Sequence, residues 1–395
     1  MTRYLSEFIK KDLTEKMVFL GGPRQVGKTT LSLNLLGTKE PTHPAYLNWD
    51  NLPTRKKILQ GWLPAEQPLI IFDEIHKYKG WRNLLKGHYD VHRNQVQFLI
   101  TGSARLDYYR KGGDSLQGRY HYFRMHPFTY GELSGLNLNS KSVDVPQFTN
   151  INSDAQSKEL ILLLLKYGGF PEPFLSANTR HWARWQRERS ERVFRDDLSG
   201  VEQVRDVNQL ETLASLLPAR IGSLLSINSL REDLNCAHES VSKWLDILEN
   251  LYVIYRILPF NMKPLKSLKK ERKLFFWDWS LAETEGAKFE NMVAGHLLKY
   301  VHFKNDWEGD SLTLTFLRDL EKREIDFLIC RKNVPLFAVE CKTSDKILSP
   351  HIKYFSERTD IPVFYQVHMG SNHIEIKEHR SFIIPFSKFC EKLGL

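Results

Sequence analysis

The sequence contains few cysteines and no long apolar run. Cys236, Cys330, Cys341 and Cys390 show no C-x-x-C spacing, which argues against a zinc site and against a disulfide framework. No apolar segment approaches the ~20 residues that a helix needs to span a bilayer, and the charged segment 1–16 lacks the pattern of a signal peptide. We therefore expect a soluble protein in a reducing cytoplasm, with no membrane partner.

Basic residues outnumber acidic ones. The chain has 56 Lys and Arg against 47 Asp and Glu, a formal charge of +9. Such a balance favours an anionic partner such as nucleic acid, although a basic solvated surface produces the same count. At 395 residues the chain is too long for one ordinary core, because domains cluster near ~100 to 200 residues. Two or three domains are expected.

The order of patterns along the chain predicts three domains. Residues 1–135 alternate strand-like apolar runs with segments of helical character, which indicates an α/β domain with a mostly parallel sheet. A polar stretch rich in Ser and Asn follows, and residues 150–262 then carry apolar residues at helical spacing. Residues 263–395 combine one helical pattern with alternating strands, which indicates a further α/β or α+β domain.

The end of the middle domain resembles a winged helix-turn-helix. One predicted helix repeats Val241, Leu245 and Leu248 before the strand-like run YVIYRI. Both DNA reading and plain helical packing fit this unit. The next run, residues 263–273, contains six basic residues in eleven, which is typical of a solvated linker.

Residues 21–30, GGPRQVGKTT, contain the G-x-x-x-x-G-K-[ST] spacing of a phosphate-binding loop. A strand-like run precedes this loop and a helical pattern follows it, so backbone N–H groups at the helix start can surround the phosphates of ATP. Lys28 is expected to neutralise phosphate charge, and the Thr29 hydroxyl to ligate Mg²⁺. The predicted nucleotide-binding residues are Gly22, Pro23, Arg24, Gln25, Val26, Gly27, Lys28, Thr29, Thr30 and Asp73.

Asp73 and Glu74 follow the apolar run LIIF, which predicts a buried strand with two carboxylates at its carboxyl end. Asp73 is expected to hold Mg²⁺ through a water, and Glu74 to orient or deprotonate the attacking water. The pair favours ATP hydrolysis over simple nucleotide storage.

Two further polar positions flank the predicted sheet. Thr101 and Ser103 end the next strand, where either hydroxyl could sense the γ-phosphate or instead cap the following helix. Arg119 precedes the fifth strand and could reach the nucleotide of a neighbouring subunit in a homo-oligomer. A surface arginine fits Arg119 equally well.

At these residues the chain resembles a family of prokaryotic AAA-type ATPases, in which GPRQVGKTTL, DEIHKYKGW, TGSA and LQGRYHYFRMHPFTYGEL occur in this order. The resemblance extends through GGFPEPFL into an associated C-terminal domain of uncharacterised function. It implies ATP binding by Lys28 and Thr29, with Asp73 and Glu74 as the Walker B pair. It also implies a sensor role for Ser103 and a finger role for Arg119, although this chain has Ala where the family more usually has a second serine after Ser103.

A second polar cluster lies near the C-terminus. Glu340 and Lys342 form E-x-K, a spacing that also occurs at residues 271–273, in the basic linker, and at residues 375–377. If IDFLIC and LFAVECK form an antiparallel hairpin centred near residue 333, Asp326 lies opposite Glu340. Neither rival E-x-K has an Asp in that position.

This arrangement resembles the PD-(D/E)xK restriction-endonuclease-like fold. Asp326, Glu340 and a further carboxylate at Glu290 are then the expected Mg²⁺ ligands, and Lys342 is expected to position the nucleophilic water. Metal-dependent cleavage of DNA, binding without cleavage, and a purely structural ion network all fit these residues.

The favoured hypothesis is an ATPase whose nucleotide cycle controls a C-terminal domain that binds DNA, with or without cleaving it. The alternative is an ATP-dependent regulatory module that binds DNA or protein without cutting it. A protein remodeler fits less well, because no substrate-threading aromatic loop is recognisable.

Overall fold

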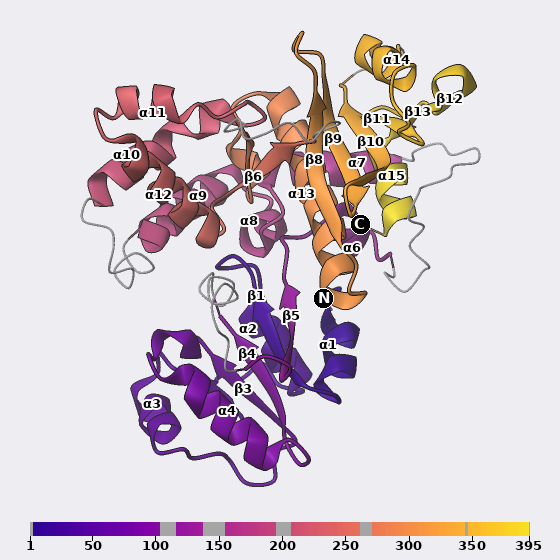
Figure 1. The fold of residues 1–395 in the computed structure, drawn as a ribbon. Helices are drawn as coiled ribbons and strands as arrows, with labels where there is room; N and C mark the ends of the chain where they lie inside the picture. The colour runs from indigo at the N-terminus through magenta and orange to yellow at the C-terminus, as the bar shows by residue number, and fades with distance from the viewer. Residues whose placement is uncertain are drawn as a thin grey trace. The chain divides into compact units, whose positions relative to one another are not determined.

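The computed structural model describes residues 3–102, 116–136, 155–194, 207–260, 271–343 and 347–394 (Figure 1). The chain divides into two compact units. Unit 1 comprises Met1–His126 with Asn250–Tyr252, and unit 2 comprises Pro127–Glu249 with Val253–Leu395.

This division differs from the three domains expected at residues 1–135, 150–262 and 263–395. The contacts join the helical middle region to the C-terminal strands. Strand β6 (Ile254–Pro259), at the end of the middle region, pairs with β7 (Lys273–Phe276) on one side and β8 on the other. One sheet therefore crosses the boundary expected at residue 262.

Unit 1 is built around a parallel sheet with the strand order β2-β3-β4-β1-β5. All five apolar runs that the sequence predicted as strands form this sheet. Its elements are α1 (Ser6–Leu13), β1 (Met17–Gly21), α2 (Lys28–Leu35), β2 (Tyr46–Asn48), α3 (Leu52–Leu59), β3 (Leu69–Asp73), a 3₁₀ turn (Ile75–Lys77), α4 (Trp81–His92), β4 (Gln97–Thr101) and β5 (Tyr120–Arg124).

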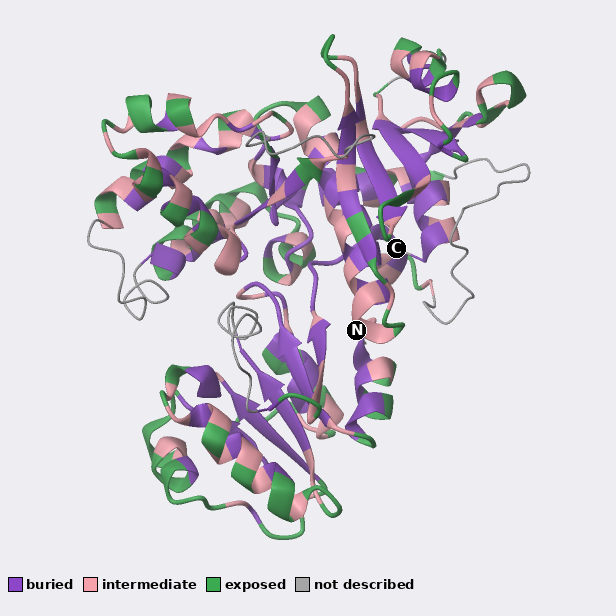
Figure 2. Ribbon diagram, in the orientation of Figure 1, coloured by how far each residue is buried: buried purple, intermediate pink, exposed green. Residues whose placement is uncertain are grey.

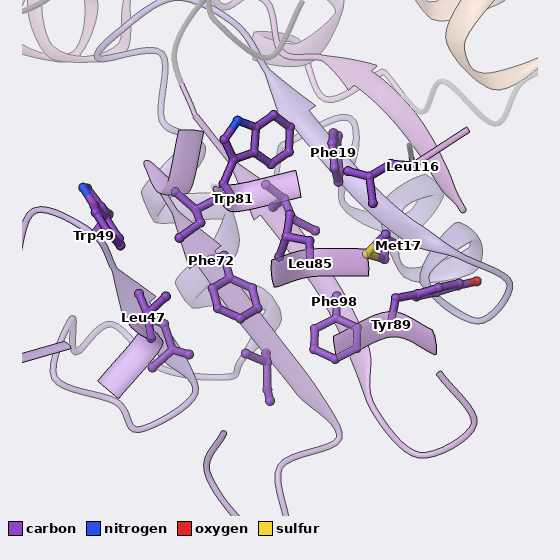
Figure 3. Packing of buried hydrophobic residues seen from close by; sticks show 14 of the residues in the cluster. Met17, Phe19, Leu47, Trp49, Phe72, Trp81, Leu85, Tyr89, Phe98 and Leu116 are labelled. Atoms are coloured by element: carbon purple, nitrogen blue, oxygen red, sulfur yellow. The ribbon is translucent and has the colours of Figure 1, made fainter. Parts of the chain in front are cut away.

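Strands β1 and β3 of unit 1 are buried throughout, as Figure 2 shows. Continuous apolar runs suit strands of a parallel sheet, because helices cover both faces. On one face Phe72 stacks beside Phe98, and Trp81 and Leu85 of α4 belong to the same cluster (Figure 3). This packing holds β1 and β3 in place. The predicted nucleotide residues lie at the carboxyl ends of these two strands.

Unit 2 contains the helical region and an eight-stranded mixed sheet with the order β12-β13-β11-β10-β9-β8-β6-β7. Its helices are α6 (Tyr130–Leu133), α7 (Ala155–Tyr167), α8 (Pro171–Ser176), α9 (Thr179–Arg192), α10 (Val207–Leu216), α11 (Ile227–Asp233), α12 (His238–Asn250), α13 (Glu285–Trp307), α14 (Pro350–Ser356) and α15 (Phe386–Leu393). Short 3₁₀ turns occupy Pro218–Arg220, Trp279–Leu281 and Lys377–His379. Besides β6 and β7, its strands are β8 (Leu312–Arg318), β9 (Glu324–Arg331), β10 (Val334–Cys341), β11 (Phe364–His368), β12 (Ile374–Ile376) and β13 (Ser381–Pro385).

Strands β9 and β10 form the antiparallel hairpin that the sequence predicted. Lys332 and Asn333 make the two-residue turn, and both have left-handed backbone angles, with φ of 49° and 66°. Two left-handed residues are the requirement of a type I′ turn, whose twist matches that of the strands. The turn pairs Arg331 with Val334, and a bulge between Pro335 and Phe337 then shifts the register by one residue. Beyond the bulge, Phe327 pairs with Val339.

No helix among the described residues is both long and apolar enough to cross a membrane.

Candidate functional site

The predicted phosphate-binding loop connects β1 to α2 in unit 1. Gly22 has φ of 139°, and a Cβ on it would lie 2.4 Å from the carbonyl oxygen of Met125. Gly27 caps α2 with φ of 98°, and Gln25 is also left-handed at 61°. Only glycine fits the Gly22 position without strain, because the backbone approaches so closely. The loop thereby turns back over the start of α2, where backbone N–H groups favour an anion.

Lys28 is the first residue of α2 and is only 7% exposed. Its ammonium donates to the carbonyl oxygens of Gly22 and Pro23, each at 2.8 Å. These contacts hold the ammonium inside the loop, beside the start of α2, where backbone N–H groups also favour an anion.

Asp73 ends β3 and accepts hydrogen bonds from three hydroxyls. Thr101 Oγ1 donates to Oδ1 at 2.5 Å, while Thr29 Oγ1 at 3.3 Å and the Tyr46 hydroxyl donate to Oδ2. Burial, and then the charge of Asp73, raise the pKa of Tyr46, which keeps its hydroxyl a donor. The sequence-predicted pair Thr29 and Asp73 is therefore in contact, although the two residues are 44 positions apart.

Glu74 follows directly, in a left-handed conformation with φ of 56°. Burial, followed by the nearby charge of Asp73, raises its pKa to about 7, against opposing effects of Lys28, Lys77 and Arg24. Its Oε2 lies 3.5 Å from Nε2 of His76 and 3.8 Å from the ammonium of Lys77. A carboxylate with this pKa is a stronger base than an ordinary glutamate.

A Mg²⁺ ion fits the residues at this edge. A hydroxyl from Thr29 lies beside a carboxylate from Asp73, and Mg²⁺ usually takes one or two protein oxygens together with waters and substrate phosphates. Of the other predicted nucleotide residues, Thr30 is exposed on the first turn of α2, while Arg24 and Val26 lie in the loop itself.

The two other predicted roles in unit 1 depend on Ser103 and Arg119. Ser103 lies outside the described residues. Arg119 lies just before β5, at the sheet edge opposite the phosphate loop, because its carbonyl accepts from the N–H of Met17 at the start of β1. Five residues of strand separate the two edges by roughly 16 Å. The guanidinium is paired with Asp90, through Nε at 2.8 Å and Nη2 at 3.2 Å. Arg119 thus faces away from the nucleotide site of its own chain.

Sequence reasoning missed two residues that support this site. The Arg3 guanidinium, 6% exposed, donates to the carbonyl oxygens of Val26 in the phosphate loop and of His126, the latter at 2.6 Å. Tyr46 holds the Asp73 carboxylate. No local motif contains either residue, so spacing along the chain gave no signal for them.

In unit 2 the hairpin brings the predicted second cluster together. The Asp326 N–H donates to Glu340 Oε2 at 3.4 Å, and the Cys341 N–H donates to Asp326 Oδ2 at 2.8 Å. The Lys342 ammonium lies 2.8 Å from Glu340 Oε1, which also accepts from Ser349 Oγ at 3.1 Å. The Asp326–Glu340 contact therefore follows the expected pairing, with the bulge supplying the offset.

Lys273 requires a correction. The sequence placed residues 271–273 in a solvated basic linker, but Lys273 lies on β7 and is 2% exposed. Its ammonium lies 2.7 Å from Glu324 Oε1, 2.9 Å from Glu290 Oε1 and 3.5 Å from Asp326 Oδ1. The preceding residues 261–270 lie outside the described part of the chain. The basic composition predicted that Lys273 would be exposed. Its ion pairs with three carboxylates instead offset the cost of burying its charge.

The cluster carries more acids than bases. Among the described residues, four carboxylates (Glu290, Glu324, Asp326 and Glu340) face the cations Lys273, Lys342 and Arg318, the last at 2.6 Å from Glu324. Burial and the charge of Asp326 raise the pKa of Glu290 to about 8 and that of Glu340 to about 7. Burial alone would lower the pKa of Lys273, but the charges of Asp326, Glu290 and Glu324 raise it. Lys273 is therefore charged.

A divalent cation does not fit the cluster in this arrangement. Both carboxylate oxygens of Glu340 and one of Asp326 accept hydrogen bonds from protein donors, and the remaining Asp326 oxygen faces Lys273. Within the described ranges, no set of three or more His, Cys, Asp or Glu side chains has the arrangement of a metal site. The predicted ligands Glu290, Asp326 and Glu340 thus belong to one cluster, but the ammonium of Lys273 is paired with two of them, Glu290 and Asp326.

Three families match successive parts of the chain. Residues 14–134 match a family described as AAA domain, so unit 1 contains an AAA-type P-loop ATPase domain. Residues 158–288 match a domain of unknown function, DUF8612, and residues 285–389 match another, DUF4143.

The chain is also similar to uncharacterized proteins of other organisms. One from Haemophilus influenzae is 23% identical over 416 residues, which cover 98% of this chain and 93% of that one. One from Mycobacterium tuberculosis is 26% identical over 267 residues, covering 67% of this chain and 55% of that protein. One from Methanocaldococcus jannaschii is 22% identical, covering 69% and 62%.

Among solved structures, the RuvB Holliday junction branch migration motor of Thermotoga maritima matches with a TM-score of 0.30 and 18% identity, over 63% of this chain and 89% of that one. The Orc1 protein of Aeropyrum pernix, solved in complex with DNA, matches with a TM-score of 0.30 and 15% identity, over 74% and 92%. At TM-scores of 0.30, neither match bears on the function of this chain.

Proposed function

We propose that unit 1 hydrolyses ATP and that its nucleotide state controls the binding of DNA by unit 2, without cleavage. The ATPase part rests on the contacts of the Asp73 carboxylate. The Thr29 hydroxyl from the phosphate loop contacts the carboxylate that ends β3, and the base Glu74 follows it at once.

In this proposal the loop N–H groups and Lys28 hold the phosphates, with the ammonium exchanging carbonyl partners for phosphate oxygens. Thr29 and Asp73 would hold Mg²⁺, which supplies charge neutralisation at the phosphates when bound. Glu74 takes a proton from the attacking water. Its raised pKa and its position beside Asp73 support that role.

The ATPase part is tested with Lys28→Ala and Glu74→Gln. Lys28→Ala should abolish both nucleotide binding and turnover, because it removes the cation that the loop positions. Glu74→Gln should keep ATP binding and lower turnover by roughly 100-fold or more, because only the base is lost. ATP affinity is measured with a fluorescent nucleotide, and turnover by phosphate release.

Lys39→Ala and Glu40→Gln are matched controls, because both side chains are exposed outside the loop in the same unit. Normal turnover in both Lys28→Ala and Glu74→Gln would refute the site.

The DNA part is supported by the formal charge of +9 and by the order of elements in unit 2. Helices α11 and α12 are followed by the antiparallel pair β6 and β7, as in the winged helix-turn-helix that the sequence pattern resembles. Binding without cleavage is favoured over cleavage because a divalent cation does not fit the carboxylate cluster.

The DNA part is tested by fluorescence anisotropy of a labelled duplex, without nucleotide and with ATP bound to the slow Glu74→Gln variant. Lys243 is exposed on α12, so Lys243→Ala should weaken binding and reduce its salt dependence, as expected when one phosphate contact is lost. Lys353→Ala, which removes an exposed lysine of α14, is the control. Equal DNA affinity with and without ATP would contradict the coupling.

A further inference from the structure

The ammonium of Lys273 occupies the centre of the unit 2 carboxylate cluster. Its contacts come from different elements: Glu290 lies on α13, while Glu324 and Asp326 lie on β9. The three N–H groups of an ammonium match three carboxylate partners. The distances of 2.7 to 3.5 Å are those of charge-assisted hydrogen bonds and long ion pairs.

The Lys273 side chain is packed tightly inside the cluster. Its side chain is 2% exposed and lies over the ring of Phe316, with the ammonium 5.8 Å from the ring centroid. On the Glu290 side, Gly222 brings its backbone so close that a Cβ there would lie 2.9 Å from Glu290 Oε2. The cluster is therefore closed around the lysine as well as paired with it.

The remaining oxygens of Asp326 and Glu340 also have partners. The Cys341 N–H binds Asp326 Oδ2, and the Ser349 hydroxyl and Lys342 share Glu340 Oε1. A divalent ion at Asp326 and Glu340 would have to displace these donors while facing the fixed charge of Lys273. Coulomb repulsion between two such cations is large in a partly buried site.

We infer that Lys273 is the resident cation of this cluster, and that its ammonium takes the place a divalent metal ion would need. Unit 2 then keeps the carboxylates of a metal site as an internal ion network, and it binds its partner without metal. The inference deepens the proposed DNA-binding function, since it explains why binding is not followed by cleavage, but its geometry is independent of ATP.

The test is Mn²⁺ binding followed by electron paramagnetic resonance in full-length, nucleotide-free protein. Every sample carries Thr29→Ala, which removes one of the two predicted metal ligands of unit 1. Protein with Lys273 intact should bind no Mn²⁺ at the cluster. Lys273→Met should gain Mn²⁺ binding, and adding Asp326→Asn should remove that gain. Lys304→Met is the matched control, because Lys304 is another buried lysine of unit 2 and is paired with Glu308, outside the cluster.

The inference is overturned if protein with Lys273 intact binds Mn²⁺ and Asp326→Asn abolishes that binding. This arm needs no substitution at Lys273, so it decides the matter even where Lys273→Met fails to fold. DNA nicking by the wild-type chain with Mn²⁺, lost in Glu340→Gln, would overturn it equally.

Failure of the proposed function has a different signature. DNA affinity that ignores ATP, together with no Mn²⁺ binding, would remove the coupling and leave the role of Lys273 intact.

Discussion

Two buried lysines, Lys28 and Lys273, show that the groups around an ammonium determine what it can bind. Lys28 donates to carbonyl oxygens of the phosphate loop, beside the helix start where a phosphate is expected. Lys273 is surrounded by carboxylates, so its charge is already balanced. Both residues have the same side chain and similar burial, and only their neighbours distinguish a candidate binding group from an internal counter-ion.

His296 gives a pH dependence that belongs to one residue. Its Nε2 accepts from the Tyr130 N–H at 3.0 Å, so Nδ1, 2.7 Å from the Met292 carbonyl, carries the proton of the neutral ring. Burial, against the hydrogen bond to Met292, lowers its pKa to about 3. Lys299 on α13, paired with Glu132 of α6, is the charged group that acts on it.

Because the folded-state pKa is lowered, the contribution of His296 to stability is present above the unfolded pKa of about 6.5 and is lost as pH falls toward 3. Unfolding free energy should fall by about 1.4 kcal/mol per pH unit in this window from His296 alone. His296→Gln, which can make both hydrogen bonds, should lose that part of the slope. Urea unfolding at a series of pH values measures it, and identical slopes in both proteins would contradict the assignment.

At the scale of elements, the β9–β10 hairpin shows how a turn and a bulge together set the chemistry of a strand end. The type I′ turn at Lys332 and Asn333 sets one register, and the bulge near Pro335 changes it. A one-residue shift moves side chains to the other face of a sheet. Without the bulge, Asp326 and Glu340 would not be opposite each other.

The turn makes a prediction at this scale. Asn333→Val should destabilise unit 2 by roughly 1 to 2 kcal/mol, because a β-branched residue is strained in the left-handed conformation that Asn333 adopts at φ of 66°. Asn333→Gly, which has no such strain, is the control and should change stability little. The midpoint of denaturant unfolding of the full chain measures both, and equal destabilisation by the two substitutions would argue against the turn.

At the scale of the whole molecule, the position of Arg119 makes a prediction about assembly. Since Arg119 lies at the opposite sheet edge from the phosphate loop, it can act only on the nucleotide of another subunit. If it does, Arg119→Ala should lower turnover by ~10³-fold with little change in ATP affinity. Its pairing with Asp90 would have to open on assembly.

Mixing provides the decisive measurement. Arg119→Ala keeps an intact nucleotide site, and Lys28→Ala keeps an intact arginine, so an equimolar mixture should recover turnover that neither variant has alone. Asp90→Asn should leave the recovered turnover in place, because it removes only the resting partner of Arg119. Full turnover by Arg119→Ala on its own would identify the residue as a surface arginine.

Local patterns in the sequence were sufficient for much of unit 1. The five strands, the loop at residues 22–27 and the two carboxylates at the end of β3 all follow from apolar runs and motif spacing, because parallel strands end at one sheet edge. In unit 2, the hairpin pairing of Asp326 with Glu340 was also predictable, since it depends on residues only 14 positions apart.

The tertiary structure alone decided where distant residues meet. Arg3 on the phosphate loop, Tyr46 on Asp73 and Lys273 among the carboxylates each come from elements with no local sign of their partners. Composition placed Lys273 in an exposed linker, but the free energy of burying a charge depends on which opposite charges the fold brings within a few ångströms. The sequence thus determined the chemical groups of both clusters, and the fold determined which of these groups come into contact.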